Sequence, residues 1–207
     1  MTKGDHFDQV FKELRKTGFL LESDPNLPSV CSLIAGEPMR GSWWSHPMAQ
    51  TIFQVNEKLD DHPDVVITKL VSGKVTFVHQ KLWAELFAIG ISREAWQMNR
   101  LSASAQKLLA AIDEAGSLRT DEIKTLISKP GDVARELERR LLIYSEQFHT
   151  TTGAHAKLLE TWKHWSDRKN FDCPTMSTVD AKLRFEERLE KLNLKYTGTG
   201  RLPWSSD

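Results

Sequence analysis

The chain has 207 residues, and its 28 lysines and arginines are balanced by 28 aspartates and glutamates. A neutral total gives no overall attraction to nucleic acid or to a membrane surface, which argues against a strong nonspecific DNA binder. Any DNA contact must therefore come from a local face of the fold.

The cysteines and the first residues bear on the compartment. Cys31 and Cys173 lie far apart without metal-ligand spacing, which suits a reducing compartment better than a disulfide scaffold. The N-terminal residues are charged, unlike a signal peptide, and no apolar run approaches the ~20 residues that span a bilayer. We expect a cytoplasmic protein with no membrane contact, no metal site and no cofactor.

Repeating apolar patterns divide the first half of the chain into helices and one hairpin. Apolar residues three and four apart indicate amphipathic helices, and β-branched residues around Ser72 and Gly73 indicate two strands joined by a turn. The predicted elements are helices over 5–18, 27–36 and 45–63, a β-hairpin over 64–80 and a helix over 81–90. We expect the third helix to begin with Ser45 as its N-cap and Pro47 in its first turn. Its predicted buried stripe is Met48, Ile52, Val55 and Leu59.

The second half repeats this order less clearly. The predicted elements are helices over 102–116, 119–128 and 130–142, a strand over 143–150, a helix over 153–165 and a charged helix over 178–192. Thr120 is the expected N-cap of the second of these helices, and Pro130 lies near the start of the third. We expect the last helix to pack around Leu183, Leu189 and Leu192.

Three helices followed by a hairpin is the order of a winged helix, in which the third helix reads DNA and the hairpin is the wing. We predict a mainly α fold with short β-hairpins, of the α+β class, built from two tandem winged-helix-like units. The first unit would span residues 1–92, and the second, with the C-terminal helices, 101–207. The alternative is one mixed α+β domain in which both β regions pair into a single sheet, and element order does not separate the two.

The stretch GSWWSHP over 41–47 places two tryptophans just before the third helix. Trp43 and Trp44 could form a platform for a nucleobase, because aromatic faces stack on any base. They could instead close the first core, since large aromatic side chains are mostly buried. We favour the structural interpretation, with one tryptophan plugging the first unit and the other partly exposed.

The third helix of the first unit is the candidate reader. Its predicted outward residues include Gln50, Gln54, Asn56 and Lys58. Glutamine and asparagine side chains can pair with adenine edges in the major groove, and Arg40, just before Gly41, is placed well for a phosphate contact. The predicted DNA-binding set is Arg40, Trp43, Trp44, Gln50, Gln54, Lys58 and Lys74. The corresponding helix over 130–142 mixes acidic residues with arginines, so we expect a solvent-facing surface with ion pairs rather than a second reader.

The stretch EQFHTTTGAHAKLLETW over 146–162 is the best candidate for chemistry. Its polar residues include Glu146, Gln147, His149 and His155. Polar groups between a strand and a helix N-terminus could bind an anion or orient water. The alternative is an ordinary connection in which Thr151 or Thr152 caps the helix. The two histidines are six residues apart with no cysteine or carboxylate triad nearby, so we expect no metal site here.

Three stretches carry a resemblance to a known family: GSWWSHP, DDHPDVVITKLVSGKVTFVH and SEQFHTTTGAHAKLLETW. With the two helix-and-strand units in view, they resemble the AlkZ-like DNA glycosylase group, and more closely its short relatives. These stretches cover about a fifth of the chain. The resemblance implies tandem winged helices and a group that excises alkylated or crosslinked bases from DNA.

The chain departs from that group at the catalytic motif. The resemblance implies a Gln-x-Gln or Gln-x-Asp motif, which positions water, and no such motif occurs here. Catalytic residues are therefore not carried over, and Glu146 and His149 are candidates only for orienting water beside a flipped base. The sequence predicts a DNA-associated protein without established catalysis, with double-stranded DNA as the expected partner. The alternatives are a glycosylase that excises a damaged base and a module that binds a protein partner.

Overall fold

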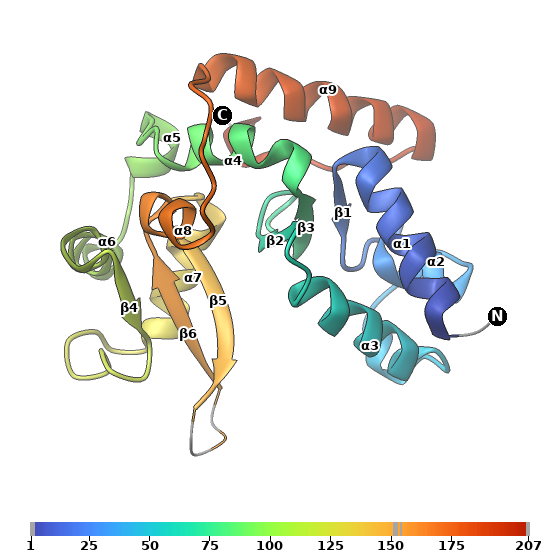
Figure 1. The fold of residues 1–207 in the computed structure, drawn as a ribbon, viewed down its shortest axis with the longest axis horizontal. Helices are drawn as coiled ribbons and strands as arrows, with labels where there is room; N and C mark the ends of the chain where they lie inside the picture. The colour runs from blue at the N-terminus through green and yellow to red at the C-terminus, as the bar shows by residue number, and fades with distance from the viewer. Residues whose placement is uncertain (1–2, 151–152, 154, 206–207) are drawn as a thin grey trace. The chain divides into compact units, whose positions relative to one another are not determined.

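The computed structural model describes residues 3–150, 153 and 155–205, and the chain folds into two compact units (Figure 1). One unit holds the chain up to Glu85 together with the stretch from Lys182 onward, and the other is Leu86–Ala181. Each unit has its own three-stranded antiparallel sheet. The mainly helical α+β class is confirmed, and the alternative of one shared sheet is wrong. The predicted domain boundaries at 92 and 101 stay a prediction.

The first unit contains the three predicted helices and the predicted hairpin. Its elements are α1 (Lys3–Thr17), β1 (Phe19–Leu21), α2 (Val30–Ala35), the 3-10 turn η1 (Trp43–Ser45), α3 (Ala49–Asp60), β2 (Val65–Thr68), β3 (Thr76–His79), η2 (Gln80–Leu82), the first residues of α4 (Trp83–Gly90), most of α9 (Thr178–Tyr196), and η3 (Pro203–Ser205). The strand β3 lies between β1 and β2, so that Val78 is opposite both Phe19 and Val66. The short strand β1 directly follows the glycine that ends α1, and it was not predicted.

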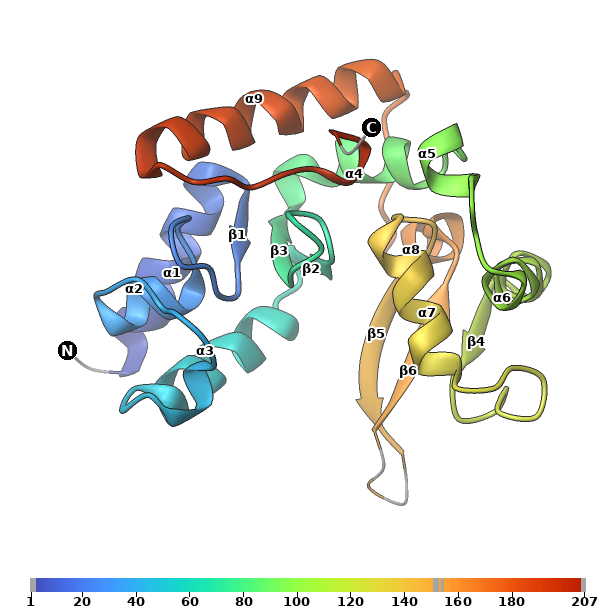
Figure 2. The ribbon, with the colours of Figure 1, turned by 180° about the vertical axis from the view of Figure 1, so that it is seen from behind.

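The core of the first unit lies where α1, α2 and α3 pack together beside the sheet (Figures 1 and 2). Three of the four predicted stripe residues of α3, Ile52, Val55 and Leu59, are buried, and Met48 packs partly buried against them. Burial of each such aliphatic side chain favours folding by about 1.5–3 kcal/mol relative to leaving it in water. The stripe fixes which face of α3 is left for solvent.

The predicted start of α3 is wrong. Trp43–Ser45 form a 3-10 turn, so Ser45 ends that turn instead of capping α3, and Pro47 precedes the helix. The turn is capped by Ser42, whose hydroxyl accepts the backbone N–H of Trp44, and α3 begins only at Ala49. The local Ser-x-Pro pattern is outweighed because Trp43 is buried in the first core and the 3-10 turn that carries it includes Ser45.

The second unit differs from the prediction in three places. It contains a short helix, α5 (Ala95–Met98), that was not predicted, and the regions 119–128 and 153–165 are not the helices that were expected. Its elements are α5 (Ala95–Met98), α6 (Ala103–Ala115), β4 (Ser117–Arg119), α7 (Pro130–Arg139), β5 (Tyr144–His149), β6 (His155–Glu160) and α8 (Trp162–Arg168). The middle strand is β6, between β4 and β5. Both sheets therefore have the same order: the first strand of the unit, then the third, then the second.

The predicted helix over 119–128 is wrong. The chain continues from β4 into turns, and Thr120 pairs with the neighbouring strand instead of capping a helix. The backbone N–H of Thr120 donates to the carbonyl of Lys157 at 2.9 Å, and its hydroxyl accepts the Lys157 N–H at 2.8 Å. Ile123 and Ile127 are still buried, which explains why an apolar pattern with helical spacing was present.

The predicted helix over 153–165 is also wrong. Its first part is the central strand β6, and only the part from Trp162 onward is helical. Thr161 is the N-cap of this short helix, and its hydroxyl accepts from the backbone of His164. The strand forms because β4 and β5 pair with it on both sides, and such pairing overrides local helix propensity. The alternative caps Thr151 and Thr152 lie outside the described residues.

The last predicted helix is confirmed as α9, but its buried face was only partly predicted. Phe185 and Leu189 are buried, whereas Leu183 is 49% exposed and Leu192 is half-buried. The ring centroid of Phe185 lies 6.2 Å from that of Phe19. The stripe is therefore set by Phe185, which meets Phe19 of β1, and by Leu189 four residues later, and the prediction for Leu183 is wrong.

Both cysteines are free. Cys31 is fully buried, and burial raises the pKa of its thiol to about 12, with the nearby Glu22 adding to the rise. The Cys31 thiol therefore stays protonated near neutral pH and packs as a small apolar side chain.

Gly90 and Gly131 provide a matched test of the second unit. A Cβ added at Gly90 would lie 2.4 Å from the indole of Trp162, which is almost fully buried, whereas a Cβ at Gly131 meets nothing within 4 Å. We expect Gly90→Ala to destabilise the protein by about 1–3 kcal/mol through overpacking. Gly131→Ala, inside α7, should be neutral or stabilising by about 0.5–1 kcal/mol. Urea unfolding followed by circular dichroism measures both, and equal stability of the two variants would contradict this packing.

Candidate nucleic-acid interface

The two adjacent tryptophans have different environments. Trp43 is 8% exposed and belongs to the core of the first unit, whereas Trp44 is 65% exposed. Their ring centroids are 4.1 Å apart with an interplanar angle of 22°, so the two indoles are stacked. The prediction of one tryptophan plugging the core and one partly exposed is confirmed.

Trp43 lies beside the half-buried carboxylate of Glu22. Its indole N–H donates to Glu22, which also accepts from Nδ2 of Asn56 at 3.4 Å. Burial raises the pKa of Glu22, although the charge of Lys69 and the bond from Trp43 oppose the rise. Asn56 is engaged with Glu22 and its Oδ1 is buried, so the prediction that Asn56 faces outward is wrong.

The solvent-facing side of α3 continues the surface that Trp44 begins. Phe53 is 37% exposed and its ring centroid lies 5.9 Å from that of Trp44. We call Trp43, Trp44 and Phe53 the aromatic ledge. Gln50 is exposed one turn before Phe53, and Gln54 is half-buried beside it. Gln50 therefore lies on the same helix face as this exposed aromatic ring, because positions three apart share a face, whereas Gln54 directly follows Phe53 and points to a neighbouring face.

Cations lie at both ends of this surface, and acidic residues gather at one of them. Arg40 is exposed in the segment before the ledge, and Lys58 is exposed on α3 with its Nζ 5.7 Å from the ring centroid of Phe7. The last turns of α3 also carry exposed carboxylates at Glu57, Asp60 and Asp61. Because these would repel phosphates, the N-terminal half of α3 is the better surface for DNA.

Lys74, at the hairpin tip, is already bound within the first unit. Its Nζ donates to Oδ2 of Asp24 at 2.6 Å. Burial alone would raise the pKa of Asp24, but the bond from Lys74 and two backbone N–H groups outweigh burial and hold that pKa below its usual value. A phosphate would have to compete with this carboxylate, so Lys74 is the weakest of the predicted phosphate contacts.

In the second unit, the candidate Glu146 belongs to an ion-pair network. Nη2 of Arg168 donates to Oε2 of Glu146 at 2.8 Å and to Oε2 of Glu160 at 2.6 Å. Glu160 is fully buried and also lies 2.7 Å from Nδ1 of His164. The bonds to Glu160 raise the pKa of Arg168 above its usual value against the effect of burial, and Glu146 adds to the rise. This network is a structural clamp between β5, β6 and α8.

The other polar residues of this stretch are not brought together with Glu146. Nε2 of Gln147 lies 2.8 Å from Nδ1 of His155, across the β5–β6 pair. Successive residues of a strand face opposite sides, so Gln147 and Glu146 project from different faces of the sheet. The backbone of His149 pairs with His155, and the His149 side chain lies outside the described part of the structure.

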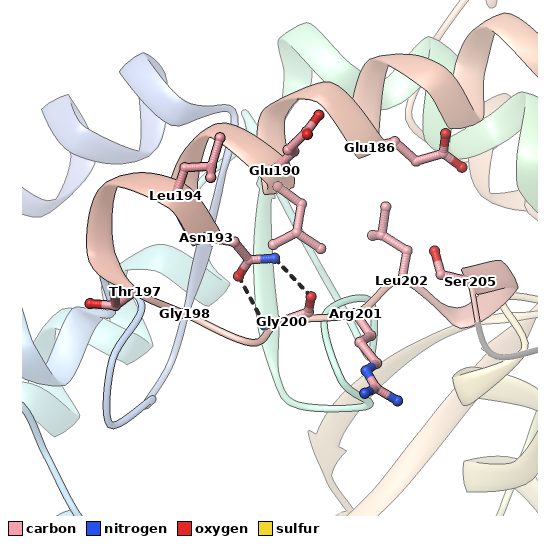
Figure 3. A pocket seen from close by; sticks show the side chains of 11 residues that line it. Glu186, Glu190, Asn193, Leu194, Thr197, Gly198, Gly200, Arg201, Leu202 and Ser205 are labelled. Atoms are coloured by element: carbon pink, nitrogen blue, oxygen red, sulfur yellow. Dashed lines mark hydrogen bonds between the residues drawn. The ribbon is translucent and has the colours of Figure 1, made fainter.

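A groove of about 580 Å³ lies beside α9 in the first unit (Figure 3). Leu189 and Leu202 are buried at its wall, and Glu190 lines it together with Leu194, which is 76% exposed. The side chain of Asn193 donates to the carbonyl of Gly200 and accepts its N–H, both at 2.9 Å, which holds the segment after α9 in place. The sequence analysis did not predict this groove. The one indication in the sequence is Leu194, an apolar residue that does not fall on the buried stripe of α9.

With this geometry in place, comparison with known families assigns the chain. A family model described as AlkZ related matches residues 5–198. The chain belongs to the AlkZ-related family. A search of curated proteins and a search of solved structures found no match. Membership confirms the resemblance seen in the three sequence stretches, and the family indicates a function associated with DNA repair.

Two further properties of this AlkZ-related chain concern its described residues. They include no group of three or more histidines, cysteines or acidic residues that could hold a metal ion. No helix among them is long and apolar enough to cross a membrane.

The two carboxylates bound by Arg168 differ in burial and therefore in the expected effect of their removal. Glu160→Gln should destabilise this AlkZ-related protein by about 3 kcal/mol, because it breaks a buried ion pair. Glu146→Gln removes a carboxylate whose side chain is 42% exposed and should cost less than about 1 kcal/mol. Urea unfolding of both variants checks the difference. A large effect of Glu146→Gln and a small one of Glu160→Gln would show that the clamp is assigned to the wrong carboxylate.

Proposed function

We propose that this protein binds double-stranded DNA through the N-terminal half of α3, the segment before it and Lys58 near the end of the same helix, as a tandem winged-helix protein in the cytoplasm. The order α1, β1, α2, α3, β2, β3 with β3 in the centre of the sheet is the order of a winged helix. The same sheet order in the second unit supports two such units in tandem. Family membership supports an association with DNA.

The observation that carries the proposal is the exposed face of α3. Its buried stripe leaves Gln50, Phe53 and Lys58 toward solvent, with Arg40 and Trp44 in the segment ahead. Glutamine can bond bidentately to adenine, and arginine and lysine contact phosphates. A helix of 12 residues is about 18 Å long, which suits insertion into a major groove.

The second unit is proposed to support DNA binding without reading bases. Glu138 of α7 is 5% exposed and accepts from Ser145 and Lys157. Glu136 accepts the backbone N–H and the hydroxyl of Ser102 at the start of α6. These contacts commit much of α7 to holding its own unit together.

Charge limits the affinity that this face can provide. Among the described residues, Arg40 and Lys58 have no ion-pair partner, whereas Lys74 is bound to Asp24. Two phosphate contacts predict a slope of about −2 in a plot of log K against log salt concentration, or a loss of roughly tenfold between 50 and 200 mM salt. The proposed binding is therefore moderate and depends on more than charge.

Fluorescence anisotropy of a labelled duplex, titrated at several salt concentrations, tests the proposal. Arg40→Ala and Lys58→Ala should each weaken binding and reduce the salt slope by about 1. Lys191→Ala is the matched control, because it removes one positive charge from the exposed side of α9. It should leave the salt slope of DNA binding unchanged. Absence of binding at low salt, or equal effects of all three substitutions, would overturn the proposal.

A protein partner is the second candidate, and the groove beside α9 favours it. An apolar wall next to Glu186 and Glu190, with Leu194 exposed, suits a partner segment that carries an apolar anchor among basic residues. If the groove is the binding site, a partner protein that binds the immobilised wild-type chain should not bind the Leu194→Ser variant. The wild-type chain should also show no DNA binding. The contacts of Glu146 favour a structural role over catalysis, so base excision involving Glu146 or His149 stays a prediction.

A further inference from the structure

Trp44 exposes a large part of its indole to solvent, and this exposed surface contributes nothing to the core of the first unit. One face of its ring is covered by Trp43, yet the side chain is 65% exposed. A ring that is covered on one face and still so exposed must present its opposite face to solvent. This leaves a flat aromatic surface open at the N-terminal end of α3.

We infer that the aromatic ledge is a stacking site for one unpaired DNA base, so that the protein prefers DNA with an extrahelical base to a fully paired duplex. The inference rests on the proposed function, since it concerns the same surface. It adds the class of DNA that this surface selects.

The ledge is preorganised for stacking. Trp43 lies in the core beside Glu22, so the ring that supports Trp44 is packed within the first unit. The backbone carbonyl of Trp43 accepts from His46 at 3.0 Å, which closes the 3-10 turn that carries both rings. Because Trp44 already stacks on the buried Trp43, a base can stack on it with little rearrangement of the protein.

An unpaired base fits this surface better than a paired base does. Each base inside a duplex is already stacked on both faces, and extruding it costs free energy that a mismatched or unpaired base avoids. The exposed amide of Gln50 lies one turn from Phe53 and could bond to the base edge, while Arg40 could contact the adjoining phosphate. Since charge provides only moderate affinity here, a stacking contact would dominate the choice of DNA.

A large protein partner fits the ledge less well. Trp44 and Phe53 are the two large apolar side chains exposed on this face among the described residues, and the other exposed residues of α3 are polar, with Gln50 one turn before Phe53. A protein interface needs a broader apolar centre with charged residues excluded from it. Two rings within a polar rim match the size of one nucleobase.

The test compares three DNAs: a short matched duplex, the same duplex with 2-aminopurine paired to thymine, and the same duplex with 2-aminopurine as a single extrahelical base. Affinity is measured by anisotropy, and stacking by quenching of the 2-aminopurine emission. This probe is preferred to protein emission because the chain has seven tryptophans. The variants are Trp44→Leu, which keeps apolar bulk without a flat ring, and Trp44→Phe, which keeps an aromatic face.

The wild-type protein should bind the extrahelical base about tenfold more tightly than the matched duplex and should quench its emission. Trp44→Leu should remove the quenching and bring the affinity for the extrahelical base down to that for the matched duplex, whereas Trp44→Phe should keep most of the preference. Equal wild-type affinities for the duplexes, or an equal loss for all of them in Trp44→Leu, would overturn the inference and leave duplex binding standing. If no DNA binds, the proposed function fails as well. Unchanged circular dichroism melting excludes unfolding as the cause.

Discussion

The stack of Trp44 on Trp43 is the contact on which the proposed surface depends. Trp43 is fixed by the core and by its bond to Glu22, and Trp44 rests on it with 65% of its side chain exposed. The 3-10 turn that carries both rings delays the start of α3 to Ala49. The same local structure therefore closes the first core and sets the exposed face of α3 beside an aromatic surface.

The two units share one sheet order but differ in the surface that they offer. In both, the first strand pairs with the third, and the third pairs with the second. In the first unit, the third helix α3 exposes the amide of Gln50 and the ring of Phe53. In the second unit, the corresponding helix α7 carries Glu136 and Glu138, which accept hydrogen bonds from their own unit. The exposed face of α3 is free to contact a ligand, whereas much of α7 bonds within its own unit. A chain with no net charge could therefore bind DNA through one local surface.

Most helices, the β2–β3 hairpin and strand β5 could be predicted from the sequence because apolar spacing and glycine or proline punctuation agree there. The prediction fails over 119–128 and 153–165, where Thr120 and β6 follow strand pairing instead of local propensity. At the site, exposure of Gln50 and Lys58 follows from the buried stripe of α3, and the division of the tryptophans into one buried and one exposed follows from the limited room in the first core. The bonds of Lys74, Asn56 and Glu146 could not be predicted, since their partners lie 50, 34 and 22 residues away.

The most direct test of where DNA binds is a titration of the ¹⁵N-labelled protein with a short duplex, followed by two-dimensional NMR. The account predicts that the largest amide shifts fall between Arg40 and Lys58, with the Trp44 indole N–H among the most affected signals. Shifts concentrated in the groove lined by Leu194 and Leu202, or confined to the second unit, would contradict it.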